Sequence, residues 1–260
     1  MNRMLLKRED VYKGNLILVN KKYGCGEFGK EDLIPVREER YGVLLRQRAV
    51  VLLASLMEEI RGWNGIVPVS GFRSIQEQQK IWDGSLLENG KEFTEKFVAL
   101  PGHSEHQTGL AIDLGVKMKK IDFICPAFPY SGICQTFRER AADYGFVERY
   151  PKGKEDITGI GHEPWHFRYV GVPHAAVMAQ KELTLEEYVD FLKGYAFGEN
   201  PFVYEQKGRW VEISYLPLPD ESREILLDDR RPYSISGNNM DGCIITQWES
   251  KTASGRRNSA

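Results

Sequence analysis

The sequence Leu100-Pro-Gly-His-Ser-Glu-His-Gln-Thr-Gly-Leu-Ala-Ile-Asp-Leu-Gly115 predicts a polar loop that runs directly into a strand. In its second half, Leu110, Ile112 and Leu114 alternate with smaller or polar residues, as they do in a strand whose successive side chains point to opposite faces. The aliphatic residues therefore share one face of the strand, and Asp113 lies on the other. We expect the aliphatic face to be buried against the rest of the fold.

Helices and strands are expected on both sides of this stretch. Apolar residues recur at three- and four-residue steps over residues 41–61, which is typical of a helix packed on a core. Ser74 and Glu77 have the spacing of a capping box and predict the start of a second helix, which is expected to end near Leu87, before Asn89 and Gly90. The other expected elements are an extended segment or strand at 15–20, strands at 66–70, 120–124 and 165–170, and helices at 133–146, after Pro173 and from Thr184. Because these elements do not alternate regularly, we expect an α+β fold with a small antiparallel sheet flanked by helices.

After Gly194 the character of the sequence changes. Short runs of β-branched and aromatic residues at 202–204, 210–215 and 242–248 are separated by Pro, Gly and Asn, which is typical of strands joined by turns. We therefore predict two domains, residues 1–196 and a β-rich extension at 197–260. Residues 252–260 are small, polar and basic, and are expected to form a disordered tail.

Composition and charge exclude several classes of protein. The 260 residues include 35 basic and 37 acidic side chains, a balance that argues against a nucleic-acid binder. No CxxC pair occurs, which excludes a Cys-rich zinc ribbon; the four cysteines are interpreted as reduced thiols, and a Cys125–Cys134 bridge stays open. No apolar run is long enough for a membrane anchor or a signal peptide, so a cytoplasmic location is expected.

Four of the five histidines fall in two short clusters, at residues 102–113 and 161–166. A catalytic zinc ion needs three protein ligands and one open position, together with a nearby general base that is not itself a ligand. His106, Asp113 and His166 could supply the three ligands. A single histidine is more often structural than a ligand, but two clusters of this composition together favour a metal site.

The predicted strand at 165–170 indicates how the second cluster is oriented. Its aromatic residues at alternate positions share one face, which is expected to be buried, so His166 points to the opposite face. Pro164 disfavours a helical conformation of Glu163, which places Glu163 on an extended turn just before the strand. Glu163 could then approach the attacking water while His166 binds the ion.

Three motifs resemble those of the zinc D,D-peptidases of the VanX/VanY type. Ser104-Glu-His-Gln-Thr-Gly-Leu-Ala-Ile-Asp113 is similar to their SxHxxGxAxD signature, Glu163-Pro-Trp-His166 to their ExWH signature, and Ser70-Gly-Phe-Arg-Ser74 to their SGYRS segment. The resemblance covers residues 15–195 and is closest to the bifunctional VanXY enzymes of vancomycin-resistant bacteria. Those enzymes hydrolyse both D-Ala-D-Ala and the terminal D-Ala of pentapeptide precursors. One departure is Phe72, which stands where the family often has Tyr.

This resemblance implies a hedgehog/D,D-peptidase-like fold, Zn2+ as the cofactor, and a role for each matching residue. His106, Asp113 and His166 would bind the zinc ion. Glu163 would take a proton from the attacking water and pass it to the leaving amine. Arg73 would stabilise the negative charge that develops on the carbonyl oxygen.

The resemblance also implies a small peptide substrate, D-Ala-D-Ala or a peptidoglycan precursor pentapeptide. Ser104 and Gln78 would help to hold it, through its C-terminal carboxylate and neighbouring amide groups. Two alternatives stay open. One is an L,D-carboxypeptidase or a cell-wall endopeptidase on the same fold, and the other is a zinc-stabilised binding module without activity.

Overall fold

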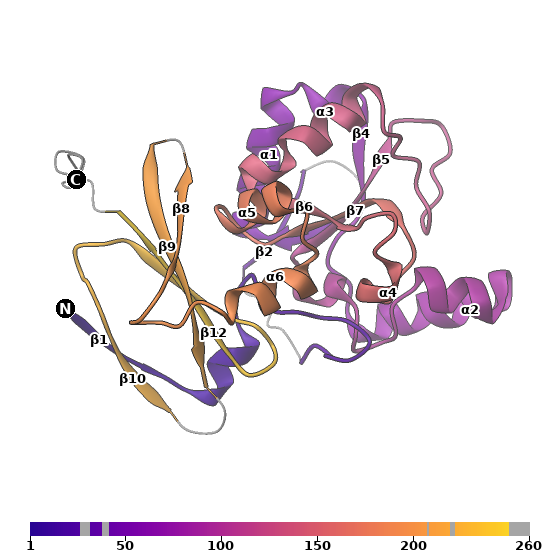
Figure 1. Cartoon of the computed structure of the whole chain (residues 1–260). Helices are drawn as coiled ribbons and strands as arrows, with labels where there is room; N and C mark the ends of the chain where they lie inside the picture. The colour runs from indigo at the N-terminus through magenta and orange to yellow at the C-terminus, as the bar shows by residue number, and fades with distance from the viewer. Residues whose placement is uncertain (27–31, 38–41, 207, 219–221, 250–260) are drawn as a thin grey trace. The chain divides into compact units, whose positions relative to one another are not determined.

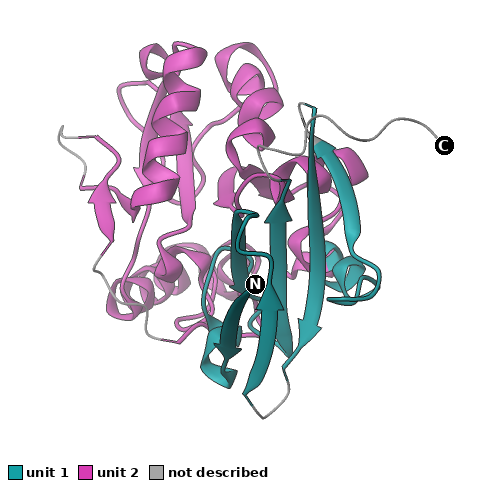
Figure 2. Cartoon of the chain, turned by 90° about the vertical axis from the view of Figure 1, so that its left-hand side faces the viewer, with its two compact units in different colours: residues 1–18, 187–260 teal, residues 19–186 magenta. Residues whose placement is uncertain are grey.

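The computed structural model describes residues 1–26, 32–37, 42–206, 208–218 and 222–249. Contacts divide the chain into two compact units, drawn in different colours in Figure 2. One unit is the continuous segment 19–186, and the other combines residues 1–18 with residues 187–260. Short helices and small antiparallel sheets make up the chain, so the predicted α+β class is confirmed.

This division differs from the predicted domains, 1–196 and 197–260. β1 (Asn2–Leu6) pairs antiparallel with β10 (Arg223–Leu227), so the N-terminal residues belong with the C-terminal part of the chain. α6 (Leu185–Leu192) crosses the boundary between the two units. The N-terminal strand escaped prediction because its partner lies more than two hundred residues away in the sequence.

A four-stranded antiparallel sheet forms the centre of the unit at 19–186. The strand order is β4-β5-β7-β6 (Figure 1). These strands span Ile66–Ser70 (β4), Ala111–Val116 (β5), Phe146–Tyr150 (β6) and Glu163–Tyr169 (β7). β5 is an inner strand that pairs with both β4 and β7. The strand expected at 120–124 is not formed. Residues 15–20, expected as an extended segment or strand, form no strand, and residues 16–19 are buried.

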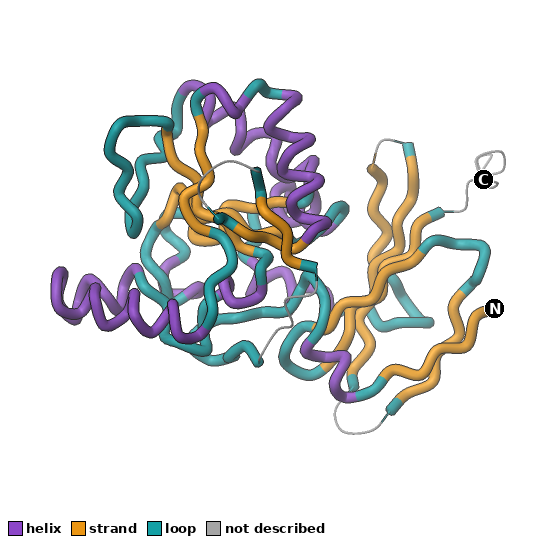
Figure 3. The backbone as a smooth tube through the Cα atoms, turned by 180° about the vertical axis from the view of Figure 1, so that it is seen from behind, coloured by secondary structure: helices purple, strands orange, loops and turns teal. Residues whose placement is uncertain are grey.

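Helices surround this sheet. The α-helices of the unit are α1 (Gln47–Glu59), α2 (Ile75–Phe97), α3 (Gly132–Ala141), α4 (Glu155–Thr158) and α5 (His174–Lys181), with short 3-10 turns η2 (Gly62–Asn64), η3 (Glu105–Thr108) and η4 (Ala142–Tyr144). β2 (Leu33–Pro35) and β3 (Leu44–Arg46) form a separate two-stranded pair. Figures 1 and 3 show α1 and α3 together on one side of the sheet and α2 on the other.

The two faces of the sheet differ in character, as the alternation in the sequence predicted. Ile112 of β5 and Phe167 of β7 pack with Leu53 of α1 and Phe137 of α3 in one hydrophobic core. Burying such side chains contributes about 1.5–3 kcal/mol each, which fixes this face of the strands. The opposite face carries polar side chains, among them Asp113.

α2 begins as predicted and ends later. The Ser74 side chain accepts from the Glu77 backbone N–H, and the Glu77 carboxylate accepts from the Ser74 backbone N–H. The helix was expected to end near Leu87, and Gly90, three residues later, has φ 79° and interrupts the helical geometry. A glycine tolerates this positive φ at little cost, so a second helical segment follows it and reaches Phe97.

The second unit consists mainly of strands. Its four-stranded antiparallel sheet has the order β11-β12-β9-β8, beside the β1–β10 pair. The strands span Phe202–Gln206 (β8), Arg209–Pro217 (β9), Tyr233–Gly237 (β11) and Gly242–Trp248 (β12), and η1 covers Arg8–Tyr12. Gly237 is required here because a Cβ atom would lie 2.0 Å from the backbone oxygen of Val11. The predicted strands at 202–204, 210–215 and 242–248 are confirmed.

Several expectations concern features other than the fold. All four cysteines are free thiols, so the Cys125–Cys134 bridge is not formed. Across the described parts of the chain, no helix combines the length and the apolar character needed to cross a membrane. The predicted tail at 252–260 lies outside the described residues.

Candidate active site

Strand pairing brings the three predicted metal ligands together. Asp113 of β5 lies opposite His166 of β7 in the antiparallel register, and His106 comes from η3, just before β5. Their ligand atoms all lie within 4.8 Å of one another. The Asp113 Oδ2 atom is 3.1 Å from His106 Nε2, and Oδ1 is 2.9 Å from His166 Nδ1. The predicted convergence of these residues is therefore present.

The spacing and chemistry of this group fit zinc. Around a tetrahedral zinc ion with bonds of about 2.0–2.2 Å, neighbouring ligand atoms lie about 3.3 Å apart. Each histidine nitrogen lies at a similar distance from one of the two Asp113 oxygens. The Nδ1 atom of His106 is 2.7 Å from the Gly71 backbone oxygen. A carbonyl oxygen only accepts, so Nδ1 carries the proton and Nε2 presents its lone pair to the site. Imidazole and carboxylate ligands of this kind suit a small divalent transition metal.

The surroundings give the two histidines different proton affinities. Burial, together with the positive charge of Arg73, lowers the pKa of His106 to about 4. Burial also acts to lower the pKa of His166, but its hydrogen bond with Asp113 and the nearby carboxylate of Glu105 outweigh it and raise that pKa to about 9. At neutral pH, one ligand must therefore lose a proton before it can bind a metal.

We expect the apparent zinc affinity to rise about tenfold per pH unit between pH 6 and pH 8, because one proton leaves His166 for each ion bound. The measurement is a chelator competition at several pH values, corrected for protonation of the chelator. It is best made on the Glu163→Gln variant, so that titration of Glu163 does not contribute. A slope near zero, or near two protons per ion, would contradict this assignment.

Glu163 lies beside the ligand group without being part of it. It begins β7, is 5% exposed, and its Oε2 atom is 3.8 Å from His166 Nδ1. Burial raises the pKa of Glu163 to about 8. A carboxyl group with a raised pKa can both accept and return a proton near neutral pH, as general acid–base catalysis requires.

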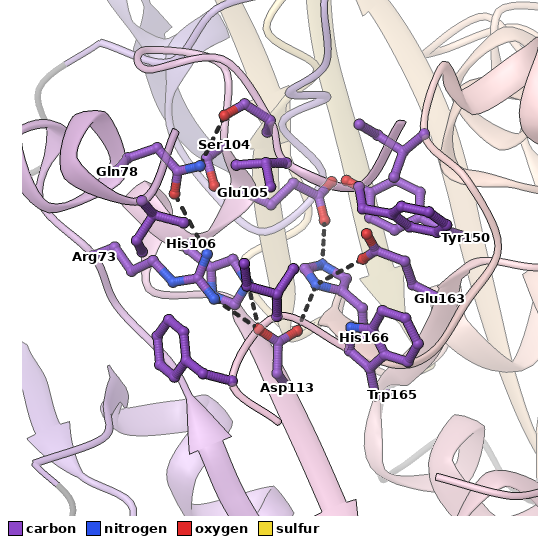
Figure 4. Close-up of a pocket in the computed structure, with 17 residues that line it drawn as sticks. Arg73, Gln78, Ser104, Glu105, His106, Asp113, Tyr150, Glu163, Trp165 and His166 are labelled. Atoms are coloured by element: carbon purple, nitrogen blue, oxygen red, sulfur yellow. Dashed lines mark hydrogen bonds and ion pairs between the residues drawn. The ribbon is translucent and has the colours of Figure 1, made fainter. Parts of the chain in front are cut away.

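Arg73 occupies the other side of Asp113, as Figure 4 shows. It lies in the turn between β4 and α2, where its Nη2 atom donates to Asp113 Oδ2 at 2.8 Å and its Nε atom donates to Ser70 Oγ at 2.7 Å. The guanidinium also lies 5.4 Å from the ring centre of Phe123. Two hydrogen bonds thus hold the Arg73 guanidinium at the site.

Gln78 and Ser104 are both buried and both line the same cavity. The Gln78 side chain donates to the Ala99 backbone oxygen at 2.8 Å, and its Oε1 atom lies 3.5 Å from Arg73 Nη1. Gln78 therefore helps to place Arg73. The role of Gln78 and Ser104 in holding a substrate stays a prediction.

The cavity around these groups encloses about 480 Å3 of empty space, part of which is open to solvent. Polar and ionised side chains line it together with apolar side chains from α2 and the loop after β5, among them Ile81, Phe97, Phe123 and Ile124. A cavity in which polar groups converge beside apolar side chains is typical of a site for a small molecule.

Sequence reasoning missed a buried charged group next to the ligands. Glu105 Oε1 accepts from Arg149 at 2.8 Å and lies 2.7 Å from Arg168 Nη1, while Oε2 lies 3.5 Å from His166 Nε2. Tyr150 covers the His166 ring, with centroids 4.9 Å apart. The sequence held one sign of this charged group, because Arg168 follows His166 by two residues on the same strand and so shares its face.

The two remaining histidines near the motifs lie outside the ligand group. His103 Nδ1 lies 2.8 Å from the Asn20 backbone oxygen, and His162 Nε2 lies 2.7 Å from the Tyr130 hydroxyl. Neither is therefore placed to complete the metal site.

Comparison with known proteins identifies the family. Residues 43–172 match the family described as VanY, D-alanyl-D-alanine carboxypeptidase. The bifunctional D-Ala-D-Ala dipeptidase and D-Ala-D-Ala carboxypeptidase VanXYC of Enterococcus gallinarum is 53% identical over 125 residues, which are 48% of this chain and 66% of that protein.

Two solved structures extend the comparison. The vancomycin resistance D,D-dipeptidase VanXYg, in complex with a D-Ala-D-Ala phosphinate analogue, is 48% identical with a TM-score of 0.93, covering 95% of this chain and 99% of that one. A mutant of the D,D-pentapeptidase VanY from a VanB-type cassette, in complex with Zn(II), is 30% identical with a TM-score of 0.55, covering 67% and 98%. By sequence and by structure, this chain belongs to the VanY family of D-alanyl-D-alanine carboxypeptidases.

Proposed function

We propose that this protein is a zinc-dependent D,D-dipeptidase and D,D-carboxypeptidase. It hydrolyses D-Ala-D-Ala and removes the terminal D-Ala of peptidoglycan pentapeptide precursors, and so supports vancomycin resistance. The observation that carries this proposal is the meeting of His106, Asp113 and His166 with Glu163 and Arg73 in one cavity. The activities of the relatives named above support the choice of substrate.

The residues of the chain divide the chemistry among them. Zinc held by His106, Asp113 and His166 would act as a Lewis acid and lower the pKa of water at the site from about 15.7 towards about 7. Glu163 accepts the proton of the attacking water and delivers it to the amine that leaves when the peptide bond breaks. The guanidinium of Arg73 stabilises the negative charge that develops on the carbonyl oxygen.

The substrate binds within the same cavity. Its C-terminal carboxylate and amide groups meet Ser104 and Gln78, and its small methyl side chains lie against the apolar wall that includes Ile81 and Phe97. The enzyme acts in the cytoplasm. Its four free thiols support this location, because reducing compartments keep cysteines unpaired.

A substrate panel on zinc-loaded, chelated and reconstituted protein tests the proposal. We expect hydrolysis of D-Ala-D-Ala and of the pentapeptide, loss of both activities on chelation, and their recovery with zinc. An L,D-tetrapeptide should remain intact. Cleavage of the L,D-tetrapeptide alone would favour the L,D-carboxypeptidase alternative, and one zinc ion per chain without any turnover would favour the binding module.

A further inference from the structure

Glu105 lies between a metal ligand and two arginines, in the interior of the unit at 19–186. It belongs to η3, directly before His106, and is 2% exposed. Its Oε1 atom meets both arginines, with Arg149 Nε at 2.8 Å and Arg168 Nη1 at 2.7 Å. Its other oxygen, Oε2, faces away from them, towards His166 Nε2.

The positive charges of the two arginines are balanced by two carboxylates. Arg149 and Arg168 have no exposed side-chain surface. Arg149 also donates from Nη1 and Nη2 to the two carboxylate oxygens of Glu186, at 2.8 and 2.7 Å. Two buried guanidiniums thus meet two carboxylates, an arrangement that avoids the large cost of an unpaired buried charge. Although burial raises the pKa of Glu105, Arg149 and Arg168 hold it well below its usual range.

Two buried atoms are left facing each other. Glu105 Oε2 and His166 Nε2 are separated by 3.5 Å, and neither makes a hydrogen bond of normal geometry with any described residue. An ionised carboxylate can only accept, and a neutral imidazole carries one N–H. In the structure, Nδ1 of the same ring donates to Asp113 Oδ1 at 2.9 Å. A metal at Nδ1 would take the place of that hydrogen, and the neutral ring would then keep its one hydrogen on Nε2, towards Glu105.

We propose that Glu105 is a positioning residue that holds His166 in the Nε2–H form, so that Nδ1 is the metal-binding atom. His106 has the reverse arrangement, because the Gly71 carbonyl oxygen takes its Nδ1 hydrogen and Nε2 faces the site. A carboxylate partner fixes the ring orientation and makes the imidazole a stronger ligand. Arg149 and Arg168 keep that carboxylate ionised and in place. The inference rests on the proposed zinc site and extends it to residues outside the ligand set.

The test compares Glu105→Gln with Glu186→Gln. Each substitution removes one negative charge from the surroundings of the same Arg149, but only Glu105 faces His166. We expect Glu105→Gln to weaken zinc binding about 10–100-fold, and Glu186→Gln to change it less than about threefold. Zinc affinity is measured by chelator competition, and urea unfolding of the metal-free variants shows how far each one is destabilised. Equal loss of zinc affinity in both variants would overturn the positioning role.

A second measurement needs no variant. Long-range 1H–15N spectra of the zinc-loaded protein, labelled at its five histidines, report which ring nitrogen of each carries hydrogen. The His166 ring is assigned from its contact with the Tyr150 ring. We expect hydrogen on Nε2 and the metal on Nδ1; the reverse would overturn the inference even if Glu105→Gln fails to fold. Wild-type protein that binds no zinc would overturn the proposed function, and this inference with it.

Discussion

Replacing Glu163 with glutamine is expected to lower kcat by about 10²–10⁴-fold, which is the usual contribution of a positioned general acid–base group. The amide has the same size as the carboxyl group but cannot take the proton of the attacking water. Glu163 lies outside the ligand group, so zinc content should stay near one ion per chain. Turnover of D-Ala-D-Ala at saturating substrate, with metal analysis of the same sample, measures both quantities.

The matched control is Glu155→Gln in α4, where the carboxyl group is outside the cavity. We expect this control to keep wild-type kcat.

In wild-type protein, the raised pKa of Glu163, about 8 before metal binds, predicts that kcat/KM falls on acidification as Glu163 becomes protonated. A bound cation favours the carboxylate and moves this decline to lower pH. Full activity in Glu163→Gln would remove Glu163 from the chemistry.

Replacing Arg73 with alanine is expected to lower kcat by about 10²–10³-fold, the range found when one donor to a developing oxyanion is removed. Arg73 also contacts Asp113, so the measurement is made at saturating zinc, with metal content determined. Because the charge on the carbonyl oxygen is largest in the transition state, we expect kcat to fall far more than KM rises.

Arg61→Ala, a substitution of an exposed arginine, is the control for this prediction and should leave kcat unchanged. A large rise in KM with kcat intact would place Arg73 in substrate binding instead. Loss of zinc at all accessible concentrations would mean that its main contact is with Asp113.

The site could be predicted from the sequence where local alternation determined the direction of side chains. Asp113 lies on the face opposite the aliphatic residues of β5, and Trp165, Phe167 and Tyr169 are buried in the core, which leaves His166 on the other face. The pairing of Asp113 with His166 depends on the register of two strands separated by fifty residues, which alternation alone does not determine. The resemblance to a known family supplied that information.

Other features depend on contacts that local sequence does not encode. Glu105 lies next to a ligand in the sequence, but its partners Arg149 and Arg168 come from β6 and β7, so the buried charged group emerges only once the sheet is assembled. Gly90 is a usual helix stop, yet here it separates two helical segments. Neither feature follows from the local sequence alone.

The pairing of β1 with β10 has a consequence for how the protein is made. Met4 aligns with Ile225, so the segment at residues 2–6 cannot find its neighbour until more than two hundred further residues have been synthesised. The unit that carries the catalytic groups, residues 19–186, emerges complete before that moment. A nascent chain stopped at residue 200 would therefore contain every catalytic side chain, while its N-terminal strand would still lack its partner.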